Sequence, residues 1–268
     1  MFFSNNCFLF FYYSFCYEYF SIFALQKFSY KLKYIYIICL LFSLVFCTEL
    51  LFAQNVRQID NVVIDYMQFA DNQSVLYYGN LQEGHPRASN HPYLKEMQYA
   101  KARLSYRNII YPEVMLRLDL NRNELVILSP NNHNIVLFSE NVNFAELHDQ
   151  HIIFFRRDSL SGSPSTGYYT VLYSENCKVL KKQTATMTVK NTGSTTQEQY
   201  YVFRNYFYLY KDDTYHTIRN KRGLLKALNP HKKELKQFIS TNKLSFRRNA
   251  DYLLVRTVSE YEKLSGSL

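Results

Sequence analysis

The sequence predicts an α+β protein, in which a strand-rich antiparallel meander precedes a C-terminal module of two or three helices. From residue 99 to residue 218, apolar and polar residues alternate, and short turn motifs separate the alternating runs. After Ile218 the apolar residues recur at helical spacing instead. So many consecutive strands would leave long unpaired edges in a flat sheet. We therefore expect a curled sheet, a partial barrel or a sandwich.

Residues 1–53 are predicted to be a leader outside the fold. The leader has three parts in order. A stretch with three lysines, Lys27–Lys33, comes first; an apolar run follows at Ile35–Phe46; and a less apolar end follows at Cys47–Ala53. This is the order of a signal peptide, and it predicts cleavage after Ala53. The mature protein would then be periplasmic, or outer-membrane-facing or extracellular. An uncleaved inner-membrane anchor is the alternative, because the apolar run approaches spanning length.

Residues 1–26 show no periodicity that suits a domain, and no Met lies between Met1 and Met67. We hypothesise that native translation begins after residue 26, at a codon other than AUG. Four of the five cysteines lie in the leader, so the mature chain keeps only Cys177 and forms no internal disulfide. Its stability must then come from packing.

The mature chain begins with two short apolar runs, Val62–Phe69 and Ser74–Tyr78, each of which could be a strand. The next segment, Asn80–Pro92, contains Gly84, Pro86 and Pro92 and is predicted to be a loop. Loops carried on a rigid scaffold are frequent sites of function.

From Tyr99 onward the alternation predicts a series of short strands. Turns are expected at Arg107-Asn108 and Asp149-Gln150. The predicted strands are Tyr99–Tyr106, Val114–Leu120, Leu125–Leu128, Ile135–Phe138, Val142–Leu147, Ile152–Arg156, Tyr168–Tyr173, Lys178–Val189, Tyr200–Tyr210 and Tyr215–Ile218. Residues 54–218 would thus form one antiparallel β domain.

Residues 219–268 are predicted to form a basic helical module packed on the sheet. A short helix is expected over Lys221–Leu228, and Asn229-Pro230 has the residue types of an N-cap and first turn for the next one. That helix would bury Leu235, Phe238 and Ile239 and end at Asn242. A last helix is expected over Asp251–Leu264, with Leu254, Val258 and Tyr261 facing inward.

The net charge is concentrated in this module. Ten Lys or Arg residues and one acid, Glu234, lie between Arg219 and Arg248, so the local net charge is 10 − 1 = +9. This predicts contact with an anionic surface, with an ordinary solvated helix face as the alternative. A nucleic-acid partner is not expected, because the chain is predicted to be exported and has no recognition motif. The candidate contact residues are Lys221, Arg222, Lys226, Lys232, Lys233 and Lys236.

A second candidate surface lies on the most aromatic strand. Arg204, Tyr206, Tyr208 and Tyr210 fall on one face of Tyr200–Tyr210. Tyrosines can stack on sugar rings or pack against a partner, whereas the alternative is a cross-strand ladder within the sheet. The other face, with Tyr201, Phe203, Phe207 and Leu209, is predicted to be core.

One set of residues has the chemistry of a metal site. If Asp149-Gln150 is a hairpin turn, His148 and His151 oppose each other and Glu146 lies on the same side as His148. Histidines beside a turn are more often simple polar residues, so this candidate is weak. We found no Walker loop, dinucleotide glycine pattern, H-E-x-x-H motif or nucleophile elbow, and we predict neither a cofactor nor an enzyme.

Several segments resemble a group of exported proteins of the Bacteroidota. The resemblance rests on LRLDLNRNELVIL (116–128), YYTVLY (168–173), VLKKQT (179–184), the aromatic strands from residue 201 and the tail KRGLLKALNPHKKELKQFISTNKLSF. It implies an envelope protein and brings no catalytic residues with it. The favoured hypothesis is a non-catalytic cell-envelope protein that binds a partner, a polysaccharide or a lipid surface. The alternative is a carrier that holds a small apolar ligand or a lipid inside the curled sheet.

Overall fold

The computed structural model describes residues 60, 62–67, 70, 73–191 and 197–266. The predicted leader therefore lies outside the described residues. Residues 60–268 form one compact unit. The two short apolar runs at its start are not strands, contrary to expectation. Residues 62–67 are helical, and a 3-10 turn, η2, spans Val75–Tyr77.

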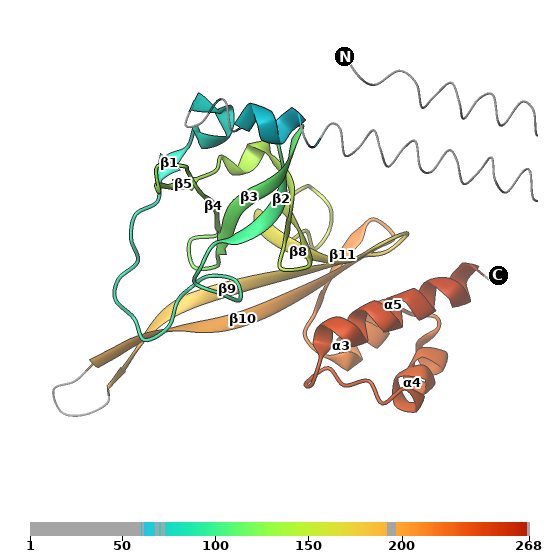
Figure 1. The fold of residues 1–268 in the computed structure, drawn as a ribbon. Coiled ribbons are helices and arrows are strands. Elements are labelled where there is room, and N and C mark those ends of the chain that lie inside the picture. The colour runs from blue at the N-terminus through green and yellow to red at the C-terminus, as the bar shows by residue number, and fades with distance from the viewer. Residues whose placement is uncertain (1–59, 61, 68–69, 71–72, 192–196, 267–268) are drawn as a thin grey trace, which may run out of the picture. The chain divides into compact units, whose positions relative to one another are not determined.

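Eleven strands form a single antiparallel sheet, which confirms the predicted α+β class (Figure 1). Their order across the sheet is β1-β5-β4-β3-β2-β6-β7-β8-β9-β10-β11. Their bounds are β1 Asn80–Leu81, β2 Ala100–Tyr106, β3 Ile109–Asp119, β4 Glu124–Leu128, β5 Asn134–Val136, β6 Val142–Leu147, β7 Gln150–Phe155, β8 Gly167–Ser174, β9 Lys178–Asn191, β10 Gln197–Lys211 and β11 Thr214–Ile218.

The sheet consists of two meanders, β2 to β5 and β6 to β11, which join where β6 pairs with β2. A 3-10 turn, η3 (Ser139–Asn141), lies just before β6. The sheet is strongly curled, because the turn after β3 reaches β9, a distant strand in the sheet order. There the backbone N–H of Ala185 donates to the carbonyl of Leu120 at 3.1 Å. The side-chain amide of Asn121 in turn donates to the carbonyl of Ala185 at 2.9 Å.

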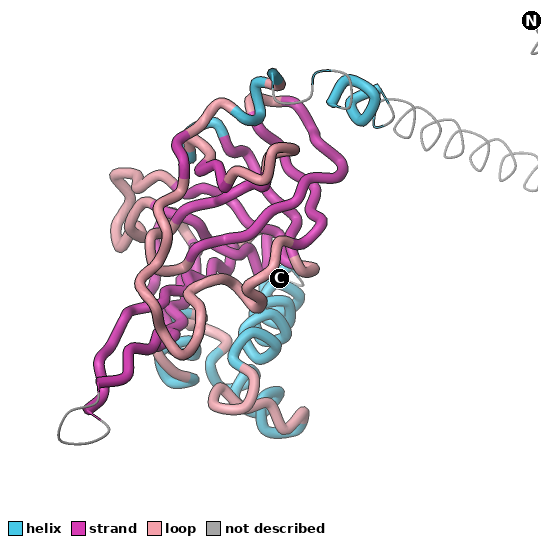
Figure 2. Tube along the Cα trace, turned by 60° about the vertical axis from the view of Figure 1, so that its left-hand side comes forward, coloured by secondary structure: helices cyan, strands magenta, loops and turns pink. Residues whose placement is uncertain are grey.

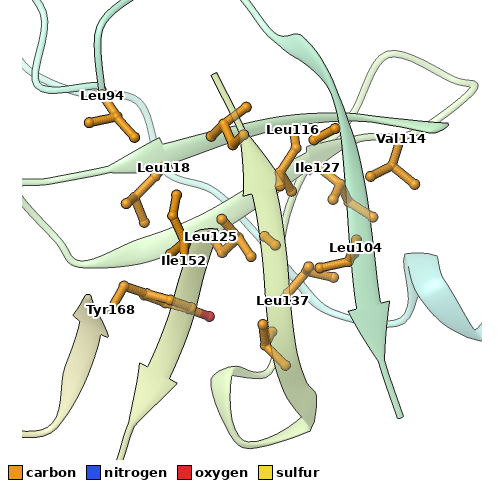
Figure 3. Close-up of a cluster of buried hydrophobic side chains, with 14 of the residues drawn as sticks. Leu94, Leu104, Val114, Leu116, Leu118, Leu125, Ile127, Leu137, Ile152 and Tyr168 are labelled. Atoms are coloured by element: carbon orange, nitrogen blue, oxygen red, sulfur yellow. The ribbon is translucent and has the colours of Figure 1, made fainter. Parts of the chain in front are cut away.

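The hydrophobic core inside the curled sheet is filled mainly by side chains from β2 to β8, with Ala185 of β9 and Tyr201 of β10 added to it. Leu104, Leu116, Leu125 and Ile127 are almost wholly buried, and their side chains point into the same space (Figure 3). The alternating sequence places these residues on the inner face of each strand. The strand prediction over residues 99–218 is therefore confirmed, and its cause is burial of one face.

Three helices cover the other end of the sheet: α3 (Lys221–Ala227), α4 (Lys232–Thr241) and α5 (Ala250–Gly266). They bury a second hydrophobic core against β9, β10 and β11, which includes Val179, Leu209 and Ile218 of the strands. The helix side of this core is Leu224, Leu225, Leu228, Leu235, Ile239, Leu253, Leu254, Val258 and Tyr261. The inward face expected for the last helix, at Leu254, Val258 and Tyr261, is thus confirmed.

The helix ends agree with the predictions except at one place. The Asn220 side chain accepts a hydrogen bond from the N–H of Gly223 and caps α3, and Asn242 ends α4 as expected. The residues Asn229-Pro230 do not begin α4, because the N-cap of that helix is His231. Polar contacts hold α5 on the sheet: Lys181 pairs with Asp251 at 2.7 Å.

Candidate functional site

The six candidate basic residues all lie exposed on α3 and α4. Each helix buries its leucines in the second core, and this orientation turns the charged side chains outward. None of the six forms an ion pair with any residue that the structure describes. We call Lys221, Arg222, Lys226, Lys232, Lys233 and Lys236 the basic surface.

The aromatic face divides into an exposed part and a packed part. Arg204 is exposed and Tyr206 has 40% of its surface exposed. The ring centroids of Tyr208 and Tyr169 lie 6.0 Å apart, and those of Tyr210 and Tyr215 lie 4.9 Å apart. Tyr208 and Tyr210 thus belong mainly to a cross-strand cluster, as in the structural alternative, whereas the other two residues remain open to a partner.

The opposite face of β10 is not core along its whole length. Tyr201 lies in the first core, and Phe207 and Leu209 lie in the second. Phe203 falls between the two cores and is 47% exposed, so the prediction of a buried Phe203 is wrong. Alternation predicts which face a side chain occupies, but not whether another element covers it.

The proposed metal ligands are displaced by the register of the β6–β7 hairpin. The turn is His148-Asp149, with both residues at positive φ, so Glu146 faces His151 and His148 lies within the turn. The predicted turn at Asp149-Gln150 is therefore wrong by one residue. The ring of His151 stacks on Phe144, with centroids 5.2 Å apart. Glu146, His148 and His151 line one open surface depression, but no group of three side chains placed to hold a metal ion occurs among the described residues.

A buried polar cluster, absent from the sequence predictions, joins the loop 82–93 to the sheet. The carboxylate of Asp119 is fully buried and lies 2.5 Å from Nε2 of His85. Backbone N–H groups of Asn121 and Arg122 donate to its other oxygen at 2.9 and 3.1 Å. Nδ1 of His85 lies 3.1 Å from the hydroxyl of Tyr201. The loop predicted to carry function therefore contributes the central histidine of an Asp-His-Tyr chain.

The chemistry of this cluster is limited by its burial. Tyr201 is only 2% exposed, so its hydroxyl is not presented to a substrate from solvent. Burial raises the pKa of Tyr201, and the nearby charge of Asp119 raises it further, so the hydroxyl stays protonated. We therefore interpret the Asp119–His85–Tyr201 cluster as a device that fixes the loop rather than as a nucleophile with its base.

Further contacts hold the same loop. The guanidinium of Arg117 lies 4.0 Å from the ring centre of Tyr93 and 4.3 Å from that of Tyr99. Such a cation between two rings is favourable when it is partly desolvated. Asn90 bonds to both backbone groups of Tyr201, through its amide at 2.9 Å and its oxygen at 2.6 Å. The loop is thus a fixed part of the surface.

The single cysteine of the predicted mature chain, Cys177, lies in surroundings that disfavour its thiolate. Cys177 is buried in the second core. Burial and the neighbouring Glu262 raise its pKa to about 11, the opposite of what an activated thiol needs. Glu262 also accepts hydrogen bonds from the N–H of Cys177 and the hydroxyl of Tyr173, which fixes α5 against the β8–β9 turn.

No family model, curated protein or solved structure matches this chain. The resemblance to exported Bacteroidota proteins therefore stays a prediction. Within the described part of the chain, no helix has both the length and the apolar character needed to cross a bilayer.

Proposed function

We propose that the protein is a non-catalytic binding protein of the cell envelope, and that its basic surface holds an anionic phospholipid membrane. The observation that supports this most directly is the set of six exposed cations without a described ion pair. In solution these charges repel one another, and a negatively charged surface relieves that repulsion.

The helical geometry favours a membrane surface over a single polymer chain. The cations lie on the outward faces of α3 and α4, whereas Leu225, Leu235 and Ile239 point into the core. Cations distributed over two helices suit a broad surface, and Leu235 and Ile239 of α4 are buried and so not available for insertion. Each Lys or Arg near such a surface contributes about 1 kcal/mol, and salt screens the attraction.

The carrier alternative has less support. The side chains of the first core, among them Leu104, Leu116, Leu125 and Leu147, are wholly buried and occupy the interior of the curled sheet. A carrier would need an apolar cavity in that place. The proposed location follows the predicted leader: periplasmic or outer-membrane-facing, or held at the inner membrane if the leader stays uncleaved.

Vesicle sedimentation tests the proposal with purified residues 54–268, which lack the apolar leader and include the whole compact unit 60–268. We expect co-sedimentation with vesicles that contain phosphatidylglycerol, weak binding to pure phosphatidylcholine, and release as salt is raised. Replacing Lys232, Lys233 and Lys236 by Glu should abolish the difference between the two vesicles without changing the melting temperature.

A control variant with the same change of net charge shows whether binding depends on the basic surface or on the net charge alone. Arg107, Arg157 and Lys190 are exposed and lie outside the helical module, so changing them to Glu alters the net charge equally. This control should still bind anionic vesicles through the basic surface. Equal sedimentation of both triple variants, or preferential binding to dextran sulfate over anionic vesicles, would overturn the proposal.

A further inference from the structure

Part of strand β10 lies at an open border of the sheet. β11 pairs with residues 207–211 of β10 only. Farther along the same border, Ser89 donates to the carbonyl of Gln199 and Asn90 bonds to Tyr201. Between these two contacts, the backbone of residues 202–206 has no hydrogen-bond partner on that side among the described residues, and we call these residues the open edge. Figure 1 shows β10 along the border of the sheet here, and Figure 2 shows the β9–β10 hairpin from another direction.

The register shows which backbone groups of the open edge face outward. Tyr201 directs both its backbone groups toward the loop, away from β9. Ala185 of β9, the partner of Phe203, directs its N–H to Leu120, away from β10. Antiparallel pairs alternate between bonded and non-bonded. The N–H and C=O groups of Phe203 and Asn205 therefore point out of the sheet at the open edge.

The side chains around the open edge are exposed and basic. Phe203, Arg204, Asn205 and Tyr206 are all exposed. Arg204 lies within the open edge, and Arg219 directly follows Ile218, the β11 residue that pairs with Phe207, so two arginines lie within and beside the open edge. Both are exposed and form no ion pair with a described residue.

We propose that the open edge binds an extended acidic peptide of a partner protein by β-strand addition. The peptide would exchange backbone hydrogen bonds with Phe203 and Asn205, and its side chains would alternate between the exposed Phe203 and Tyr206 faces. Its carboxylates would meet Arg204 and Arg219, whose charges select acidic over basic sequences. This site is distinct from the basic surface and does not depend on membrane binding.

A second copy of this chain fits the open edge less well. Two copies can pair there only with each Phe203 opposite the other copy's Asn205, because Asn90 and β11 block the shifted registers. That arrangement sets Arg204 directly opposite the Arg204 of the other copy. Like charges directly opposite in a sheet are destabilising.

Amide hydrogen exchange on the full-length chain tests the proposal, with a blocked hexapeptide of alternating glutamate and valine as the probe. In the free protein the amides of Phe203 and Asn205 should exchange fast, whereas those of Val202, Arg204 and Tyr206, bonded to β9, should be protected. The probe should slow exchange at Phe203 and Asn205 by about tenfold or more. The same peptide with lysine in place of glutamate should not.

Two further reagents make the result specific. Asn205→Pro removes an N–H from the open edge but none from the β9 ladder, so it should abolish probe binding, whereas Asn205→Ala should retain it. If Asn205→Pro fails to fold, a probe with N-methylated valines gives the same test from the peptide side. Unchanged exchange with the probe, or equal binding of the methylated probe, would refute the proposal. Protection that grows with protein concentration alone would assign the edge to a second copy.

The outcome of the peptide experiment does not depend on the outcome of the vesicle experiment. The Lys232, Lys233 and Lys236 charge reversal should leave probe binding unchanged, because none of these residues lies at the open edge. Loss of probe binding in that variant would contradict the separation of the two sites.

Discussion

Two carboxyl groups lie side by side where β3 meets β4, because Asp119 and Glu124 are direct cross-strand partners. Asp119 is satisfied by His85, Gln82 and two backbone N–H groups. For Glu124, Oε2 is buried without a hydrogen-bond partner in the described part of the chain. Burial raises the pKa of Glu124 above its usual 4.5, and the charge of Asp119 raises it further.

This raised pKa gives a pH-dependent prediction. The unfolded state ionises Glu124 more easily, so the fold loses stability as pH rises from 4.5 through the higher folded pKa. Glu124→Gln removes that loss. We expect the variant to be more stable than wild type at neutral pH, with the difference vanishing under acid conditions where both states are protonated. Urea unfolding across this pH range measures the effect.

Glu96→Gln provides the control for the pH effect, because Glu96 is exposed. Its stability should follow that of wild type at every pH. A Glu124→Gln variant that gains the same stability at acid and neutral pH would show that the effect is packing and not ionisation.

The surroundings of a residue could be predicted where they depend on the local sequence pattern. They could not be predicted where they depend on contacts between residues far apart in the sequence. The outward direction of Lys232 and Lys236 follows from helical spacing alone. By contrast, His85, Asp119 and Tyr201 lie far apart in the sequence, and only the curl of the sheet brings them together. A sequence signal for one member existed: Asp119 is a charged residue on a strand of alternating leucines, next to a turn.

At the scale of elements, two residues of α4 with the same predicted position differ in how deeply they are buried. Leu235 and Phe238 were both expected inside, but Leu235 is wholly buried and Phe238 only partly. Leu235→Ala should reduce the free energy of unfolding by about 2–5 kcal/mol, because it leaves a cavity. Phe238→Ala should reduce the free energy of unfolding clearly less, because the Phe238 side chain is already partly exposed to solvent. Chemical denaturation of the two variants and wild type makes the comparison, and an equal loss would contradict it.

Some predicted element boundaries and types were wrong, for physical reasons that residue spacing does not reveal. The β6–β7 turn uses His148 and Asp149 because both can adopt positive φ, and this choice shifts every residue of the proposed metal set. Residues 62–67 form a helix although their short apolar run suits a strand equally. Strands from β2 onward were predictable because each buries part of one face, which gives the sequence its alternation.

At the scale of the whole molecule, one long hairpin belongs to both hydrophobic cores. β9 and β10 contribute Ala185 and Tyr201 to the first core, and Val179 and Leu209 to the second. The ion pair between Lys181 and Asp251 lies on the same hairpin, beneath α5. Because the two strands are continuous, loss of either core removes packing from the ladder that supports the other.

This shared hairpin predicts cooperative unfolding of residues 60–268. Leu104→Ala in the first core and Leu254→Ala in the second should each reduce stability by about 2–5 kcal/mol, because both leucines are fully buried. Each substitution should also accelerate hydrogen exchange in β2 and in α5 together, measured by mass spectrometry under native conditions. Exchange that accelerates only in the mutated core would mean that the hairpin does not couple them. In that case the sheet and the helical module would unfold as separate units despite their common strands.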